Sequence, residues 1–349
     1  MIEINGAQGE GGGQVLRSSL TLSALTGKPL HIDHIRAKRS KPGLRPQHLA
    51  AVQAITKLTD AQVSGAHLSS SELTLVPTKL HPGRYRFEIP TAGALTLVLQ
   101  TVFLPLSFAE GISSITLTGG THVPWSPIFH YLTEHWLPVM LSLGFRAELA
   151  MDQAGFYPQG GGVAQAHILP VKDLHPLSCT KRGSLIRIRG ISGVANLKDD
   201  IAKRQKHQAL RRLYSDCQET KINTLNLPAP GKGTFVMLRP IFENSGYACF
   251  SALGAPGKPA EQVADEAVDQ LLSFLDTDGC VDPYLADQLL LPLLVCPGDS
   301  TFSTSRVTQH LLTNAQIIDH FLPDRVNIEG ALGSPGRVEV GGKLVSPWR

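Results

Sequence analysis

Residues 301–321 read TFSTSRVTQHLLTNAQIIDHF and combine two hydrophobic periods in one short stretch. The first part alternates apolar and polar residues as a strand does, and the second part spaces its apolar residues as a helix does. The pattern therefore predicts a strand at 300–305 and a helix at 308–321. His310 lies where the intervening loop passes into the predicted helix.

The same order of elements occurs in two further segments of the chain. Each segment has an apolar helix-like run, a glycine, a short strand and a second, amphipathic helix. The matching runs are 12–27, 30–37 and 46–58; 92–111, 113–120 and 127–141; and 284–298, 300–305 and 308–321. Repeats of this kind indicate either a solenoid or a compact domain, and only three long units favour a pseudo-threefold domain.

Histidines at matching positions of the three units predict an insertion. His48 and His130 are 82 residues apart, whereas His130 and His310 are 180 residues apart, an excess of 98. Residues 181–276 read as a strand, a basic helix, more strands and an acidic helix. We therefore expect an α/β (α+β) fold, with a repeat-built large domain at 1–180 and 277–349 and a small α/β domain at 181–276 inserted in the third unit.

Composition excludes several classes of protein. The chain has 349 residues, is 42% hydrophobic and carries a net charge of +3, too little to indicate nucleic-acid binding by itself. Its five cysteines lack CxxC spacing, which argues against a zinc site or a disulfide framework and for a reducing compartment. Because neither a signal peptide nor a membrane-spanning run is evident, we expect a cytoplasmic protein.

A glycine-rich stretch, GAQGEGGGQVLR at 6–17, precedes the first predicted helix. Backbone amides at such a helix start bind anions, since no side chain blocks the approach. Glu10 is a carboxylate within this stretch, which suits a divalent metal that bridges to phosphates. The alternative is a flexible turn with a solvated glutamate.

A basic loop, HIRAKRSKPGLRPQH at 34–48, contains no acidic residue. Its arginines suit a polyphosphate or an RNA backbone, because a guanidinium binds two phosphate oxygens at once. The alternative is a solvated basic face. The basic helix at 203–212 lacks comparable neighbours, so we assign it to a solvated face or to diffuse charge toward RNA.

His310 is a candidate nucleophile on chemical grounds. A neutral imidazole attacks phosphorus near pH 7 and forms a reactive phosphoramidate. Capping or packing is the commoner use of a histidine, so the pattern alone leaves both alternatives open.

The chain closely resembles the RNA 3'-terminal phosphate cyclases. The similarity covers nearly the whole chain in order and is carried by GAQGEGGGQVLRSSL, IRAKRSKPGLRPQHL, LVLQT, GFYPQGGG, DPYLADQL and QHLLTNAQIIDHFLP. The family fold is three βα repeats interrupted by a small α/β insert. The resemblance implies that His310 takes AMP from ATP, that AMP passes to a 3'-terminal RNA phosphate, and that the neighbouring 2'-hydroxyl closes a 2',3'-cyclic phosphate, with pyrophosphate and AMP released.

The resemblance also implies roles for individual residues. Glu10 corresponds to the metal ligand, for Mg²⁺ or Mn²⁺. Arg17 corresponds to an arginine near that metal ligand and is expected to bind the cofactor. Residues expected to bind phosphates or the RNA end are Arg36, Arg39, Gln47 and His48. Residues expected to line the adenylate pocket are Gln100, Tyr284, Asp287 and Gln288. Asp287 is close to the nucleophile in the family, and a carboxylate there suits orientation of the His310 imidazole.

One segment departs from the family pattern, GGTHVPWSPIFHYL at 119–132. His122 and Trp125 either stack on an unpaired base or are a neutral variation, and RNA-end preference depends on which holds. Two other functions compete with cyclase activity: a non-catalytic ribosome-assembly protein of the same family, and an enolpyruvyl transferase. The expected partner is RNA with a 3'-terminal phosphate, with no membrane and no obligatory protein partner.

Overall fold

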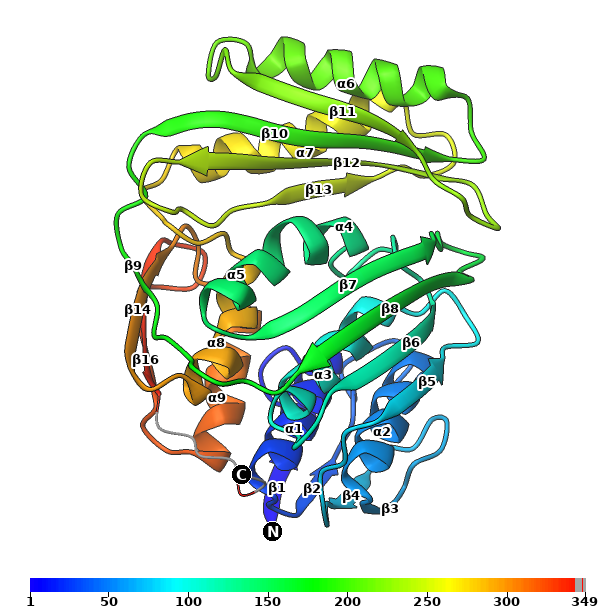
Figure 1. The fold of residues 1–349 in the computed structure, drawn as a ribbon, viewed down its shortest axis with the longest axis vertical. Coiled ribbons are helices and arrows are strands. Elements are labelled where there is room, and N and C mark those ends of the chain that lie inside the picture. Colours follow the sequence, from blue (N-terminus) through cyan, green and yellow to red (C-terminus); the bar gives the residue numbers. More distant parts are fainter. Residues whose placement is uncertain (343–346, 348–349) are drawn as a thin grey trace.

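The structure is a computed structural model that describes residues 1–342 and Pro347. Figure 1 shows a lower body of sheets and helices and a smaller group of elements at the upper end. The predicted large domain extends to residue 349, so its positions 343–346 and 348–349 lie outside the described residues. The fold is mixed α/β, as the sequence predicted at this level. Among the described residues, no helix is long and apolar enough to cross a membrane.

The first sheet has the order β1–β2–β4–β3. Its strands are β1 (Ile2–Asn5), β2 (Leu30–Asp33), β3 (Gln62–Ser64) and β4 (Leu73–Val76). The parallel strands β1 and β2 are joined through α1 (Gly13–Thr26), and α2 (Pro46–Thr59) follows β2. Because α1 is buried on almost every side, it lies inside the body and packs against neighbouring helices.

The second sheet has the order β5–β6–β8–β7. Its strands are β5 (Arg84–Glu88), β6 (Ser113–Gly119), β7 (Arg146–Gln153) and β8 (Gly162–Leu169). The parallel strands β5 and β6 are joined through α3 (Leu95–Ser107). The helix predicted over 127–141 is divided into α4 (Phe129–Tyr131), the π-helix η1 (Leu132–Trp136) and α5 (Leu137–Ser142). Pro138 lies at the start of α5, where a missing N–H is tolerated.

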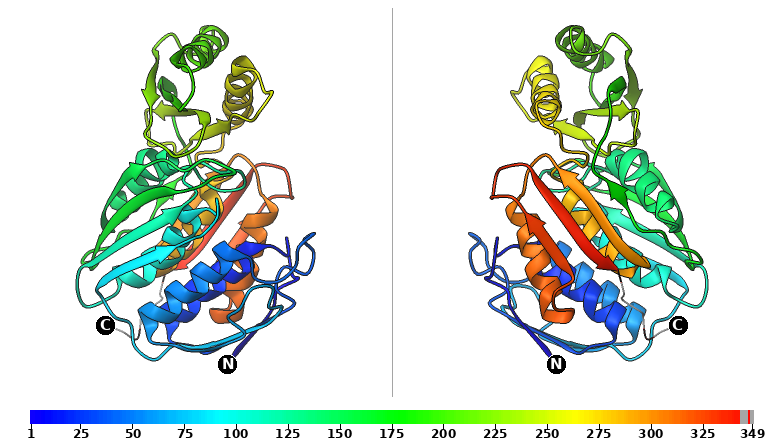
Figure 2. Two further views of the ribbon diagram at one scale, coloured as in Figure 1. Left: turned by 90° about the vertical axis from the view of Figure 1, so that its right-hand side faces the viewer. Right: turned by 90° about the vertical axis from the view of Figure 1, so that its left-hand side faces the viewer.

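The third sheet has the order β15–β16–β14–β9. Its strands are β9 (Ser178–Cys179), β14 (Gly298–Thr304), β15 (Val326–Glu329) and β16 (Gly336–Gly342). The helix α8 (Leu285–Val295) precedes β14, and α9 (Gln309–Phe321) follows it. The stretch 301–321 therefore contains most of β14 and all of α9, close to the predicted boundaries. Figure 2 shows α9 beside α1 on one side of the lower body, and the two helices are in contact.

The upper group contains the fourth sheet, with the order β11–β10–β12–β13. Its elements are β10 (Leu185–Ala195), α6 (Asp199–Leu213), β11 (Thr220–Asn226), β12 (Gly233–Phe242), β13 (Phe250–Leu253) and α7 (Ala260–Leu275). Both helices pack on the same face of this sheet, over a cluster of buried residues drawn from 188–274. Figure 2 shows the group as a separate layer above the lower body.

Arg182 ties together the two chain segments that enter and leave the upper group. Its guanidinium donates hydrogen bonds to the carbonyls of Phe274, Leu275, Thr277 and Gly279, at 2.5 to 3.2 Å. Each carbonyl lies at or beyond the end of α7, where helix carbonyls lack partners within the helix. The positive charge of Arg182 is also attracted to the negative end of the helix dipole.

Candidate active site

Glu10 lies in the glycine-rich loop between β1 and α1, and this loop packs closely against α9. The Glu10 N–H donates to Thr313 Oγ1 of α9 at 3.2 Å. A Cβ added at Gly9 would lie 2.2 Å from the same oxygen, and Gly9 has a φ of +55°. The close approach and the left-handed backbone both favour glycine there. The loop therefore holds Glu10 beside the start of α9.

Glu10, Arg39 and His310 form the centre of the candidate site. The Glu10 side chain is only 8% exposed and pairs with the Arg39 guanidinium through Oε2. The same oxygen lies 3.9 Å from His310 Nε2. The other oxygen, Oε1, is buried and has no hydrogen-bond partner. An unpartnered buried carboxylate oxygen is unfavourable by itself, so the site is suited to a ligand that would occupy that position.

Position and environment leave the His310 imidazole accessible. It lies in the first turn of α9, which is capped by a hydrogen bond from the Leu311 N–H to Thr308 Oγ1 at 3.1 Å. The side chain is 53% exposed. Partial burial lowers the pKa of His310 below 6.5, Glu10 opposes this shift, and Arg17 and Arg39 add to it. A neutral imidazole at the positive end of a helix can meet an anionic substrate without protonation.

Arg17, Gln14 and Asp287 form a polar layer next to this centre. Arg17 Nη2 donates to Gln14 Oε1 at 3.0 Å, and Gln14 Nε2 donates to Asp287 Oδ2 at 3.3 Å. Burial raises the pKa of Asp287 to about 7, against the opposing effect of Arg17. Burial also lowers the pKa of Arg17 to about 10, while Glu10 and Asp287 favour its charged form. Arg17 is thus a cation near two carboxyl groups.

His48 is buried in the first turn of α2, with its ring directed toward α1. Its Nδ1 accepts the Arg45 N–H at 3.2 Å, and a Cβ added at Gly13 would lie 2.5 Å from its Nε2. Burial, followed by Arg17, Arg36 and Arg45, lowers the pKa of His48 to about 3. A neutral imidazole that accepts at Nδ1 carries its proton on Nε2. His48 therefore presents an N–H donor on the side of Gly13.

Arg36 shapes the basic loop around the site. It has a φ of +55°, and its Nη1 donates to the carbonyls of Lys41 and Gly43 at 2.7 and 2.9 Å. Burial lowers the pKa of Arg36, and the nearby Arg39 and Arg45 lower it further. The loop therefore gathers cations that repel one another, an arrangement that a bound anion would relieve.

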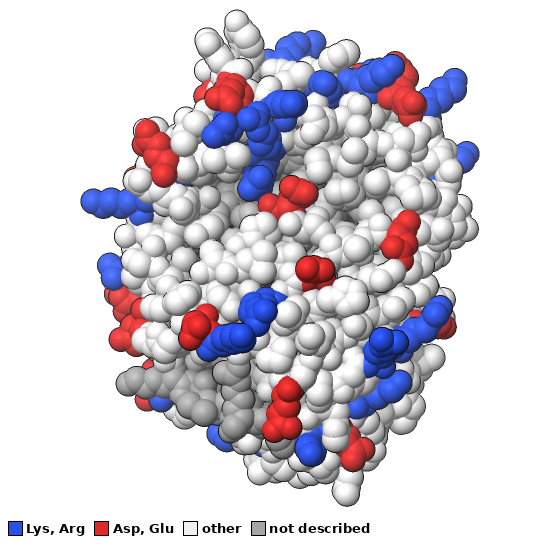
Figure 3. Space-filling view, viewed as in Figure 1, with Lys and Arg blue, Asp and Glu red and all other residues white. Residues whose placement is uncertain are grey.

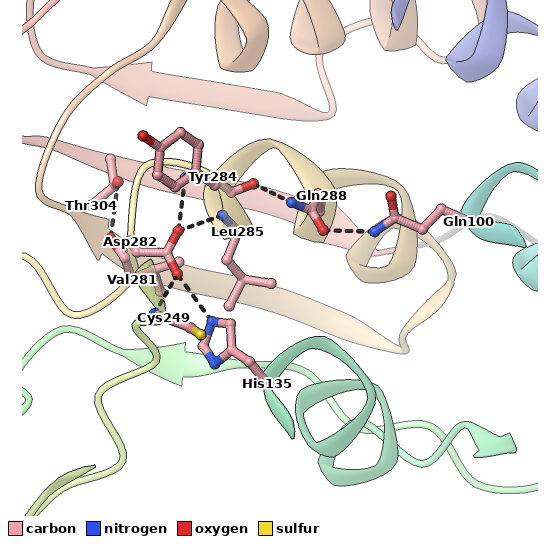
Figure 4. Close-up of polar contacts among 9 residues, drawn as sticks. All are labelled: Gln100, His135, Cys249, Val281, Asp282, Tyr284, Leu285, Gln288 and Thr304. Atoms are coloured by element: carbon pink, nitrogen blue, oxygen red, sulfur yellow. Dashed lines mark hydrogen bonds and ion pairs between the residues drawn. The ribbon is translucent and has the colours of Figure 1, made fainter. Parts of the chain in front are cut away.

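A second polar chain runs along the start of α8 (Figure 4). Gln100 Nε2 donates to Gln288 Oε1 at 2.6 Å, and Gln288 Nε2 donates to the Tyr284 carbonyl at 2.7 Å. Tyr284 is 44% exposed, and its hydroxyl donates to Gln270 of α7 at 2.9 Å. The two glutamines come from matching helices, α3 and α8. This series of hydrogen bonds therefore joins two of the three similar sequence segments.

Asp282 fixes the start of α8 and was not among the predicted site residues. Its Oδ1 accepts the N–H groups of Tyr284 and Leu285 at 2.8 Å each, as helix-capping carboxylates do. Its Oδ2 lies 3.0 Å from His135 Nε2 and accepts the Cys249 N–H at 3.2 Å. The sequence did contain a signal for this helix start, because Asp282 and Pro283 directly precede the apolar run of α8.

The structure separates some residues that the sequence grouped together. The Asp287 carboxylate contacts Gln14, whereas the carboxylate next to the His310 ring is that of Glu10. Gln47 accepts the Ala94 N–H at 3.0 Å, at the edge of the site. His130 pairs with His122 at 2.8 Å, away from this cluster. Gln14, which links Arg17 to Asp287, was missed because its partner lies 273 residues away.

The structure narrows two alternatives that the sequence left open, base stacking by His122 and the role of the basic helix. His122 is 1% exposed, so it cannot stack on a base, whereas Trp125 is fully exposed. The basic helix α6 pairs with the acidic helix α7: Arg204 donates two hydrogen bonds to Glu261, and Arg212 pairs with Asp265 and Asp269. Its charge is thus partly neutralised within the chain. Figure 3 shows Lys and Arg side chains mixed with Asp and Glu side chains on the face in view, with uncharged surface between the groups.

A divalent cation fits the donor atoms at Glu10. Hard cations take oxygen ligands, and Mg²⁺ is commonly held by one or two carboxylates together with substrate phosphates. The buried Glu10 Oε1 offers one such oxygen. Within residues 1–342 and Pro347, no cluster of three or more His, Cys, Asp or Glu residues is present. A cation held by Glu10 would take its remaining oxygen ligands from other sources, such as substrate phosphates and water.

Comparisons of the sequence with known proteins show one family. The family model for RNA 3'-terminal phosphate cyclase matches residues 8–328. Proteins of that name from Pyrococcus abyssi and Methylococcus capsulatus are 41% and 40% identical, over 97% and 98% of this chain and 98% and 97% of theirs. An EPSP synthase structure from Acinetobacter baumannii covers 96% of this chain and 81% of its own at 12% identity, with a TM-score of 0.28 that is too low to support any inference.

Proposed function

The chain belongs to the RNA 3'-terminal phosphate cyclase family of enzymes, and from this we propose that it uses ATP to convert an RNA 3'-terminal phosphate to a 2',3'-cyclic phosphate. The observation that carries the proposal is the exposed His310 imidazole, 3.9 Å from the buried Glu10 carboxylate and close to the Arg39 cation. The proposed nucleophile therefore lies near a cation and near the carboxylate that we propose as metal ligand, which supports the proposal.

The proposed reaction has three displacements at phosphorus. The His310 imidazole attacks the α-phosphorus of ATP, and the bond to the bridging oxygen breaks to release pyrophosphate. An oxygen of the RNA 3'-phosphate then attacks the histidine-bound AMP, and the phosphorus–nitrogen bond breaks. Finally, the 2'-hydroxyl attacks the activated terminal phosphorus, the cyclic phosphate closes and AMP leaves.

Charge neutralisation by the site residues supports these steps. Arg39 and Arg17 are cations near His310, and His48 offers an N–H donor toward the same loop. Such fixed donors stabilise negative charge as it develops on phosphate oxygens. Bound Mg²⁺ or Mn²⁺ would supply further positive charge to the phosphates, held by Glu10. Arg36 stiffens the loop that carries Arg39 through its hydrogen bonds to loop carbonyls.

Asp287, Gln100, Tyr284 and Gln288 are proposed to hold the nucleotide part of ATP. Asp287 acts on the site through Gln14 and Arg17, since its carboxylate accepts from Gln14. Tyr284 offers an exposed ring at the start of α8, and Gln288 and Gln100 fix the neighbouring helices. Gln47 positions the start of α3 beside the RNA end through Ala94.

We also propose the domain organisation expected from the sequence. Three βα units form a large domain from 1–180 and 277–349, and 181–276 form an inserted domain. Supporting this, β1–α1–β2 and β5–α3–β6 are parallel strands joined by a helix, and a parallel bridge from Val281 to Thr304 encloses α8. The separate buried cluster of the upper group supports the insertion.

Two alternatives are weaker on specific observations. A non-catalytic assembly protein has no use for an exposed imidazole beside an unpartnered buried carboxylate oxygen. An enolpyruvyl transferase needs no nucleophilic histidine, and the similarity to EPSP synthase carries no argument at its TM-score.

The test is conversion of a defined RNA end. The purified chain is incubated with ATP, Mg²⁺ or Mn²⁺, and a labelled RNA that ends in a 3'-phosphate, with a 3'-hydroxyl RNA as the matched control. We expect the label of the 3'-phosphate to become resistant to alkaline phosphatase, with AMP released in equal amount. A phosphate that stays sensitive with either metal would contradict the proposal.

A further inference from the structure

The loop between β6 and α4 exposes a large aromatic side chain. Trp125 is 100% exposed and has a φ of +64°. A bulky residue with positive φ is a genuine backbone outlier, and an exposed indole gives up the free energy of burying its large apolar surface. Both features are unfavourable for folding, which points to a use in binding.

The loop is firmly anchored on both sides of Trp125. The N–H groups of Thr121 and His122 both donate to the Gly155 carbonyl, at 2.9 and 3.1 Å. His122, Val123 and Ile128 are each no more than 3% exposed. The exposure of Trp125 is therefore set by a fixed backbone, so its ring is presented outward before any ligand arrives.

A short path of contacts connects this loop with the candidate active site. Gln47, next to His48, accepts the Ala94 N–H at 3.0 Å. Ala94 forms a parallel bridge with Gly120, and the Leu95 N–H donates to the Gly120 carbonyl at 2.9 Å. Gly120 begins the loop that carries Trp125. The loop that carries the exposed indole is therefore joined, through Gly120 and Ala94, to Gln47 at the edge of the site.

A second exposed aromatic lies on the adjoining loop. Tyr157 is 67% exposed and follows Phe156, which forms a parallel bridge with His122. The rings of His122 and Phe156 are stacked with centroids 5.0 Å apart, so the two loops are packed together. Residues 120–128 contain no Lys or Arg, so contact with a ligand there is by ring faces rather than by charge.

We propose that Trp125 stacks on an unpaired base of the RNA, upstream of the 3'-terminal phosphate, with Tyr157 beside it as a second ring. The inference rests on the proposed function, which places that phosphate at Arg39 and His310. Unpaired bases are bound by aromatic side chains with little sequence preference, because every base has a flat π face. Trp125 then sets a preference for RNA ends that are single-stranded.

The stacking is tested by two measurements, the affinity of the protein for an oligonucleotide and the fluorescence of Trp125. Trp125→Ala, Trp125→Phe and the control Tyr214→Ala are prepared in a Trp348→Phe background. Tyr214 is 71% exposed and lies at the end of α6 in the upper group. Trp136, the remaining tryptophan, is 2% exposed and buried in the core. The probe is a single-stranded oligonucleotide with a 3'-phosphate, and a blunt duplex with the same end serves for comparison.

We expect Trp125→Ala to weaken single-strand binding by about 5- to 100-fold, Trp125→Phe to recover most of it, and Tyr214→Ala to change it less than twofold. The single strand should quench the fluorescence of Trp125 more than the duplex does. An affinity of Trp125→Ala within twofold of the parent, or an equal loss in Tyr214→Ala, would overturn the inference. AMP transfer to the parent protein without RNA tests the proposed function separately.

Discussion

His310 and His130 occupy matching places in the sequence pattern, and burial lowers the pKa of both, yet they differ in exposure and in the groups beside them. His310 is half exposed and faces a carboxylate, with two arginines nearby. His130 pairs with His122 at 2.8 Å and packs on Phe235, with ring centroids 4.9 Å apart. Burial lowers the pKa of His130 to about 4. One imidazole is available to a substrate, and the other is part of the packing beneath the upper group.

The comparison teaches that residue type and repeat position do not assign a role. In the His310 region, polar atoms are left without partners, as the Glu10 Oε1 atom is. In the His130 region, the polar atoms of His122 are satisfied by Thr121 and His130, and Phe156 and Phe235 cover the rings. The unpartnered carboxylate oxygen beside His310 suits a ligand site, whereas the paired and covered rings of His122 and His130 suit a structural role.

The largest expected effect of a carboxylate change is at Glu10. Glu10→Gln keeps the side-chain shape but removes the charge that pairs with Arg39 and faces His310. We expect AMP transfer to the protein to slow by about 10²- to 10³-fold, comparable with loss of a key electrostatic group. The rate is measured with ATP and metal in the absence of RNA.

Glu134→Gln is the matched control from the other region, since Glu134 lies in η1 next to His135. We expect its rate to stay within about twofold of the wild type, as is usual away from a reacting centre. Equal losses in the two variants, or no loss in Glu10→Gln, would remove the distinction between the regions.

A smaller effect, on stability rather than on chemistry, is expected at His130. His130→Leu leaves His122 Nε2 buried without its partner, which costs roughly 1 to 3 kcal/mol of unfolding free energy. The exposed His175 provides the control variant His175→Leu, for which we expect little change. Urea unfolding at pH 7 measures both.

The pH dependence of stability sharpens the same prediction. The pKa of His130 falls from 6.5 in the unfolded chain to about 4 in the folded chain, through burial beside the neutral His122 and the Phe235 ring. Below pH 6.5 the unfolded state binds more protons, so stability falls as pH drops from 6.5 toward 4. His130→Leu should lose less stability than the wild type between pH 7 and 5, by on the order of 1 kcal/mol. An unchanged slope would show that His130 is not buried in its neutral form.

Much of the fold was predictable because local patterns are strong where a whole helix or strand is periodic. The pattern around 301–321 predicted the bounds of β14 and α9 to within two residues. The division of the helix at 127–141 was not predictable, because the π-helix depends on tertiary packing. The proximity of Glu10 to His310 was not predictable from a local pattern, since 300 residues separate them.

The sequence predicted which residues belong to the candidate site but not which of their side chains contact one another. A carboxylate near His310 was expected from Asp287, whereas Glu10 occupies that place and Asp287 bonds to Gln14. Burial decides such pairings, and sequence does not report burial of polar residues. For the same reason His122 was a possible stacking residue in the sequence, but Phe156 and Phe235 cover it in the structure.

The most direct test is the mass of the intact protein after incubation with ATP and Mg²⁺ or Mn²⁺, without RNA. The sample is kept mildly basic, because phosphoramidates are acid-labile, and His310→Ala and His130→Ala are measured beside the wild type. We predict one added AMP in the wild type and in His130→Ala, none in His310→Ala, and discharge of the AMP by RNA ending in a 3'-phosphate. An AMP adduct that persists in His310→Ala, or its absence from a folded wild-type sample with both metals, would contradict the assignment of His310 as the nucleophile.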